Sequence, residues 1–241
     1  MDAMSRARSP RTKKLAAAKK PDSLAQTRAA PVFDELAQTR EGYDVLLLAL
    51  LDAGEALIAE RGLERTTAEG IAQRAGVSTD AFYAHFKDMD ALLVALNARF
   101  VEHMIAAVDE ATRAGSGRGS YVADVVEIAV RSILDVVEER RGLVRALLAR
   151  GASDGALATG LRSMGKHMTS KLVATTAGCA DASEIAPTPR TIGFSLLLSV
   201  ALAHHMVLVG DGPTGVGLTR DELAGELATA LCAYLGASRP E

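Results

Sequence analysis

Apolar residues recur at three- and four-residue spacing through most of the chain, which is the period of an α-helix with one buried side. The first such stretch contains Leu47, Leu50 and Leu51 and predicts a helix over residues 41–61, with Gly62 as its stop signal. No segment alternates apolar and polar residues in the way that predicts a half-buried strand. The pattern therefore predicts an all-α protein.

Two short helices joined by a tight turn are predicted next. Thr66 and Glu69 have the spacing of a capping box and predict the start of a helix whose apolar side includes Ile71. Gly76 ends this helix, and Ser78 is placed to cap the following one. The spacing therefore predicts a helix-turn-helix.

The second of these short helices has an inner and an outer side. Phe82 and Phe86, four residues apart, point one way, whereas Thr79, Tyr83 and His85 project elsewhere. An α-helix about 10–12 Å across enters a DNA major groove about 12 Å wide, and a preceding helix can brace it there. The outward polar side chains therefore favour a DNA-reading function.

A longer helix is predicted over residues 88–113, because Leu92, Leu96 and Phe100 repeat every four residues and Asp88 can cap its start. The run GSGRGS, residues 115–120, breaks it. Further helices are predicted at about residues 121–139, 142–150, 153–177, 188–209 and 219–235. We expect a basic N-terminal arm (1–38), a helix-turn-helix domain (39–88) and a C-terminal helical domain (89–241), the last two linked by helix 88–113.

Charge is unevenly distributed, although the formal net charge is only -3. Residues 1–30 hold two acids, Asp2 and Asp22, and eight basic residues, namely Arg6, Arg8, Arg11, Lys13, Lys14, Lys19, Lys20 and Arg28. This segment has almost no large apolar residue, and Pro10 and Pro21 interrupt it, which predicts a disordered arm. Two readings of the arm stay open, a DNA-binding segment and a solubilising extension without a partner.

Residues 43–100 resemble the DNA-binding domain of TetR-family transcriptional regulators. The matching residues are Thr66-Thr67, Ile71-Ala72, Ala75-Gly76-Val77-Ser78, Tyr83, His85-Phe86 and Leu92. Two positions depart from the family pattern, because Asp80 stands where glycine is frequent and Met89 where a phosphate-contacting lysine is usual. The rest of the chain is similar to the family's effector-binding and dimerisation domain in architecture only.

We expect DNA contacts from the outward side of this domain. Hydroxyl and imidazole groups can donate to phosphate oxygens, helix N-terminal amides attract phosphate, and small side chains can approach base edges. The predicted residues are Thr66, Thr67, Ser78, Thr79, Ala81, Tyr83, His85 and Lys87.

The charge balance of the same domain is unfavourable for binding a polyanion. Residues 40–88 contain five basic and nine acidic residues, a balance of -4. Since phosphate neutralisation supplies most non-specific DNA affinity, we expect the arm to supplement it, lying in an adjacent minor groove. The predicted arm contacts are Arg6, Arg8, Arg11, Lys13, Lys14, Lys19 and Lys20.

The resemblance implies a small-molecule effector bound among the helices after Gly119. Methionine adapts to irregular apolar shapes, and histidine or tyrosine can orient one polar group, so we expect an apolar or amphipathic effector. Core packing explains each candidate more readily than ligand binding does. The candidates are Met104, Tyr121, Met164, His167, Met168, Phe194 and His204.

The last two predicted helices are too apolar for a monomer and are joined by a Gly/Pro-rich turn, which predicts an antiparallel hairpin. Pairing with a second copy would bury their exposed sides in a homodimer. Two-fold symmetry would then place two reading helices on one side of the DNA, which predicts an inverted-repeat operator. The chain is thus predicted to be a ligand-responsive cytoplasmic regulator, most simply a repressor.

Two other classes of function have some support. GASDG, residues 151–155, matches the nucleophile elbow of hydrolases around Ser153, but residues 143–150 are predicted as helix where an elbow needs a strand, so we interpret Ser153 as a helix cap. Residues 192–209 contain no Asp, Glu, Lys or Arg and are long enough for a membrane span, which would give a membrane-associated helical interaction protein. His204 and His205 weaken the membrane interpretation.

The sequence gives no indication of a metal or cofactor site. Cys179 and Cys232 lie far apart without CxxC or Cys/His spacing, and His167, His204 and His205 lack H-x-x-x-H spacing. The basic start has no apolar stretch of the kind that a secretory signal needs. We therefore expect a protein of the reducing cytoplasm without cofactors and without enzymatic activity.

Overall fold

The computed structural model describes residues 40–116, 120–150, 155–185, 187–210 and 217–237 of the chain. Throughout these ranges the only regular elements are helices, as the apolar period predicts. The predicted basic arm lies outside the described residues, and so does Ser153.

The described helices follow one another with short connections. They are α2 (Arg40–Arg61), the 3-10 turn η1 (Leu63–Arg65), α3 (Ala68–Ala75), α4 (Thr79–His85), α5 (Met89–Gly115), α6 (Val122–Glu139), α7 (Arg141–Arg150), α8 (Gly155–Thr176), α9 (Ala182–Ile185), α10 (Pro189–Val209) and α11 (Arg220–Leu235). Every predicted helix is present with ends within two residues of the prediction, and the short α9 was not predicted.

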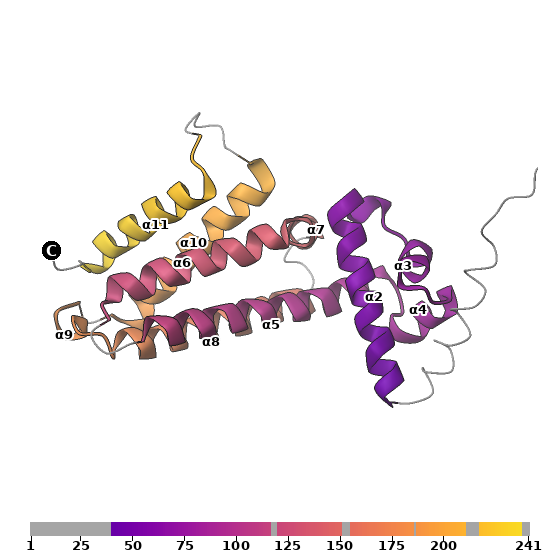
Figure 1. Cartoon of the computed structure of the whole chain (residues 1–241), viewed down its shortest axis with the longest axis horizontal. Coiled ribbons are helices and arrows are strands. Elements are labelled where there is room, and N and C mark those ends of the chain that lie inside the picture. The colour runs from indigo at the N-terminus through magenta and orange to yellow at the C-terminus, as the bar shows by residue number, and fades with distance from the viewer. Residues whose placement is uncertain (1–39, 117–119, 151–154, 186, 211–216, 238–241) are drawn as a thin grey trace, which may run out of the picture.

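Helices α2, α3 and α4 form the N-terminal unit around a small apolar core (Figure 1). Leu50 and Leu57 of α2, Ile71 of α3 and Phe82 of α4 are all buried there. Leu92, in the first turns of α5, also enters this core and lies close to Gly54 of α2. The long helix α5 is therefore anchored in the N-terminal unit by its own start.

The cap of α3 differs from the prediction. Thr67, and not Thr66, caps α3, because its Oγ1 accepts a hydrogen bond of 3.1 Å from the Gly70 amide. Thr66 is buried and donates its hydroxyl to the Gly62 carbonyl oxygen over 2.9 Å. The predicted capping box of Thr66 and Glu69 is wrong, because the preceding 3-10 turn places Thr66 at its own end.

The remaining helices form a C-terminal bundle (Figure 1). Helices α6 and α8 pack along α5, and α10 packs on both α6 and α8. Helix α11 packs on α6 and runs opposite to α10, as the predicted hairpin requires. The turn between α10 and α11 is outside the described residues from position 211 to position 216.

Two of the described helices, α5 and α10, are long and apolar enough to cross a membrane by length and composition. The core helices of soluble proteins pass the same test. Here α5 contacts α2, α6 and α8, and α10 contacts α6 and α8. Their apolar composition is therefore weak support for a membrane span.

Helices α2 and α7 approach each other closely at Gly142. A Cβ atom added to Gly142 would lie 2.6 Å from Ala59 Cα, closer than real contacts allow. We expect Gly142→Ala to lower the free energy of unfolding by about 1–3 kcal/mol through overpacking, although alanine ordinarily stabilises a helix. Urea unfolding measures this change.

Gly165 of α8 provides the matched control, since an added Cβ meets nothing within 4 Å. Gly165→Ala should stabilise the protein by about 0.5–1 kcal/mol. If Gly142→Ala stabilises the protein to the same extent, the close approach of α2 and α7 is incorrect.

Candidate DNA-binding surface and effector cavity

The turn between α3 and α4 depends on Gly76. Its φ of 74° lies in the left-handed region, and its amide donates to carbonyl oxygens at the end of α3. Ser78 then caps α4 by accepting a 3.1 Å hydrogen bond from the Ala81 amide. The turn fixes α4 against α3, with Phe82 fully buried beneath it.

Tyr83 is the most prominent outward side chain of α4. It is 55% exposed, and its ring packs edge-on against Phe82 with centroids 5.3 Å apart. The packed ring holds the phenolic hydroxyl at the surface, where it can donate to a phosphate oxygen. Lys87 is also exposed and lies 3.8 Å from the Asp88 carboxylate.

His85 is less ready to donate to phosphate than the sequence suggested. Its Nδ1 lies 3.0 Å from the Ala81 carbonyl oxygen, which can only accept, so the proton of the neutral ring is on Nδ1. The Nδ1 proton is therefore committed to the Ala81 carbonyl oxygen and does not reach a phosphate oxygen.

The other predicted contacts divide into two groups. Thr67 is exposed and Ser78 is half-buried. The oxygen of each hydroxyl accepts a hydrogen bond from a backbone amide, and the hydroxyl proton can still be donated to a phosphate. Thr79 and Ala81 are half-buried on α4. Thr66 is turned into the protein, so the structure does not bring it together with the others.

We expect Tyr83→Phe to weaken DNA binding about tenfold or less, because one donor is lost while the ring contact with Phe82 remains. The unfolding free energy should not change measurably. A filter or anisotropy titration with operator DNA, paired with urea unfolding, separates the two effects. Equal affinities of both proteins would remove Tyr83 from the interface.

A second site lies in the C-terminal bundle, where α5, α8 and α10 enclose a partly open cavity of about 330 Å³. Four of the predicted effector residues, Met104, Met164, Met168 and His204, line it. The lining residues that the sequence did not indicate are Phe100, Val137, Leu161, Gly165, Thr169, Gly193, Leu196, Leu197 and Val200. Helical spacing does not show which residues border unfilled space, and Leu161 and Leu197 are themselves 39% and 62% exposed.

The other three predicted effector residues lie elsewhere. Tyr121 precedes α6, where its backbone amide donates to Asp124. The His167 ring is partly exposed and lies 3.3 Å from the Asp109 carboxylate. Phe194 is exposed and packs against Tyr234 with ring centroids 5.3 Å apart. The structure does not bring these three side chains into the cavity.

The cavity is almost entirely apolar. None of the residues that line it is Asp, Glu, Lys or Arg. Burial lowers the pKa of His204 below its ordinary value, so its ring is neutral near pH 7. The cavity can therefore hold an uncharged apolar molecule and offer it one neutral imidazole.

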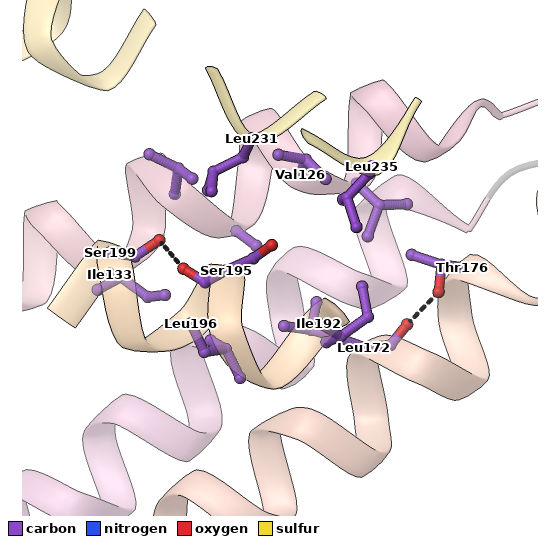
Figure 2. A pocket seen from close by; sticks show the side chains of 13 residues that line it. Val126, Ile133, Leu172, Thr176, Ile192, Ser195, Leu196, Ser199, Leu231 and Leu235 are labelled. Carbon is purple, nitrogen blue, oxygen red and sulfur yellow. Dashed lines mark hydrogen bonds between the residues drawn. The ribbon is translucent and has the colours of Figure 1, made fainter. Parts of the chain in front are cut away.

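A smaller cavity of about 30 Å³ lies between α6, α8, α10 and α11 (Figure 2). Its hydroxyl groups already have partners. Ser199 donates to the Ser195 carbonyl oxygen at 2.9 Å and Thr176 to that of Leu172 at 2.8 Å, and Ser195 donates to Thr191 at 3.0 Å. Leu196 is the one described residue that lines both cavities.

The described residues contain no group of three or more His, Cys, Asp or Glu that could hold a metal ion. Residues 143–150, which precede the GASDG stretch, lie in α7. The strand that a nucleophile elbow needs is therefore replaced by a helix, as the sequence predicts.

Comparisons with known proteins agree with the helix-turn-helix. Residues 50–96 match the family model described as bacterial regulatory proteins, tetR family. Residues 50–96 are a TetR-family helix-turn-helix. The matched residues run from the middle of α2 into the first turns of α5, so they include the turn at Gly76 and the whole of α4.

Solved structures share the fold over most of the chain. A transcriptional regulator from Rhodococcus sp. Rha1 is 22% identical, with a TM-score of 0.62 over 81% of this chain and 99% of that one. A TetR-family regulator from Mesorhizobium loti is 18% identical, with a TM-score of 0.64 over 82% and 98%. The fatty acid degradation regulator FadR from Bacillus halodurans is 19% identical, with a TM-score of 0.55 over 79% and 98%. No curated protein matches the chain.

Proposed function

We propose that this DNA-binding regulator is a homodimeric repressor that leaves an inverted-repeat operator when an apolar or amphipathic effector binds in the 330 Å³ cavity. The observation that carries the proposal is the position of that cavity. It is lined by Phe100 and Met104 of α5, and the start of the same helix is packed into the helix-turn-helix unit. We also propose the division into a DNA-binding domain over 39–88 and an effector domain over 89–241.

Helix α5 gives the effector a mechanical route to the DNA. About three turns separate Met104 from Leu92, which packs against Gly54 of α2. A ligand that displaces α5 at the cavity would tilt the DNA-binding unit and change the distance between the two copies of α4 in a dimer. Release requires that the ligand bind the DNA-incompetent arrangement more tightly.

The dimer is proposed from exposed apolar side chains on α10 and α11. Phe194, Leu197, Leu208 and Val209 on α10 and Tyr234 on α11 are all more than 40% exposed. A soluble monomer rarely leaves such a group of side chains in water, and pairing with the same surface of a second copy would cover it.

Leu198 of α10 is 39% exposed and lies one turn after Phe194. We expect Leu198→Glu, which adds charge to this surface, to raise the dimer dissociation constant at least tenfold and to weaken operator binding. Sedimentation at micromolar concentration measures the dimer. Leu48→Glu on α2, another exposed leucine, is the control and should leave sedimentation unchanged. A wild-type monomer at this concentration would contradict the proposed dimer.

The experiment that tests the proposed function most directly is selection of bound sequences from random or genomic DNA fragments. An inverted repeat should emerge. Compounds that release the protein from this site can then be titrated with and without DNA. A coupling of about 1–3 kcal/mol should change DNA affinity roughly 5- to 150-fold and ligand affinity by the same factor. Equal ligand affinity in both titrations would contradict release by the effector.

A further inference from the structure

We infer that the effector cavity takes an uncharged, linear aliphatic molecule with one terminal polar group, and that Leu196 sets the length of its hydrocarbon chain. The inference rests on the proposed effector site and assigns it a ligand class and a specificity-determining residue. Three features of the cavity support it, namely its shape, its charge and its relation to the smaller cavity.

The shape follows from the spacing of the lining residues. On α10 they are Gly193, Leu196, Leu197, Val200 and His204, one stripe of the helix. Its two ends, Gly193 and His204, are eleven positions apart, which corresponds to about 16 Å along the helix axis. Two turns of α8 between Leu161 and Thr169 form the opposite wall. A volume of 330 Å³ at about 30 Å³ per non-hydrogen atom holds about eleven such atoms, which matches a linear chain of that length.

The polar end of the ligand is assigned to His204. This histidine lies at one end of the α10 stripe, whereas Gly193 and Thr169 lie near each other at the other end. The neutral ring can exchange one hydrogen bond with a hydroxyl or carbonyl group. A carboxylate would find no Lys or Arg among the lining residues, and burying it unpaired would be costly.

The hydrocarbon end is assigned to Leu196. Leu196 also borders the smaller cavity, whose walls include Leu172 of α8 and Leu231 of α11. Figure 2 shows Leu196 on α10, directed to the side of the helix away from Leu231. Leu196 is 8% exposed and borders both spaces, so its side chain forms part of the wall between them.

The length assignment is tested with normal alkanols of about eight to sixteen carbons, which displace a neutral fluorescent dye, Nile red, from the full-length protein. Wild type should bind best near ten carbons. Leu196→Ala should move the optimum about three or four carbons longer by joining the cavities, and Leu196→Phe should move it shorter.

Leu172→Ala is the matched control. Leu172 is about as buried as Leu196 but lines the smaller cavity only. Shortening its side chain creates a similar void without opening the wall between the two cavities. It should leave the optimum unchanged and should lower the thermal midpoint about as much as Leu196→Ala. An unchanged optimum in Leu196→Ala, or an equal shift in Leu172→Ala, overturns the role of Leu196.

The charge assignment is tested at pH 8 with an alkanol and an alkanoate of the same length. The alkanol should bind at least tenfold more tightly, and His204→Leu should weaken alkanol binding by removing the hydrogen-bond partner of its hydroxyl. Tighter binding of the alkanoate overturns the ligand class. Dye displacement is measured without DNA, so alkanols that bind as expected but do not release operator DNA contradict the proposed release and leave the cavity assignment intact.

Discussion

We expect Glu55→Ala to lower the free energy of unfolding by about 2–4 kcal/mol and to weaken the communication between effector and DNA. Glu55 of α2 binds two arginines from outside the helix-turn-helix. Its Oε2 lies 3.0 Å from Arg99 of α5, and its Oε1 pairs with Arg140, between α6 and α7. Glu55 therefore joins the helix-turn-helix unit to the C-terminal bundle, in addition to the start of α5 and the contact between α2 and α7.

The large expected effect follows from burial. The side chains of Glu55, Arg99 and Arg140 are only 15%, 21% and 20% exposed, so removing the carboxylate takes this partner from a poorly hydrated Arg140 and leaves Arg99 with the more exposed Asp52. The pKa of the neighbouring His103 is lowered below its ordinary value, first by burial and then by the positive charges of Arg140 and Arg99. Water does not replace the lost partner as it would at the surface.

Asp52→Asn is the matched control for Glu55→Ala. Asp52 also pairs with Arg99, at 2.6 Å, but its side chain is 68% exposed. Loss of the Asp52 charge should lower the free energy of unfolding by less than about 1 kcal/mol. Urea unfolding gives both values. If the two variants lose equal stability, the pair of Glu55 and Arg140 does not hold the domains together.

The helices could be predicted from sequence because their signals are local. Apolar spacing fixes each buried side, and Gly76, Ser78 and Asp88 mark ends through hydrogen bonds within a few residues. Thr66 was misassigned for the same reason, since a three-residue 3-10 turn has no period to recognise. Helix α9 was not predicted because its four residues are too few to show a helical period.

The sites could be predicted less completely because they depend on long-range contacts. The outward position of Tyr83 follows from the period of α4, but the orientation of His85 depends on a carbonyl oxygen that the sequence does not indicate. Residue type favoured His167 and Phe194 as cavity residues, yet Asp109 and Tyr234 engage them elsewhere. Glu55 was not predicted at all, because its partner Arg140 is distant in sequence.

Deletion of residues 1–30 should reduce operator affinity about 100-fold at about 0.1 M salt. Few of the basic side chains in the helix-turn-helix unit are placed to meet DNA, so the arm should supply much of the phosphate neutralisation. Arg74, in the helix-turn-helix, is 2.7 Å from Glu60, so its charge is largely committed to a carboxylate. Arg61 and Arg65 border the groove next to α7 instead of α4. Lys87 is then the principal lysine or arginine near the reading helix among the described residues, and it has Asp88 beside it.

The slope of log affinity against log salt identifies the cause of that loss. Each lost phosphate contact makes the slope shallower by about 0.9, and a 100-fold loss at about 0.1 M salt corresponds to about two contacts. Replacing the eight basic residues with glutamine at constant length should give the same result as the deletion. Lys166→Gln, at an exposed position on α8, should change neither affinity nor slope. A deletion that lowers affinity but leaves the slope unchanged would show that the arm acts without touching phosphate.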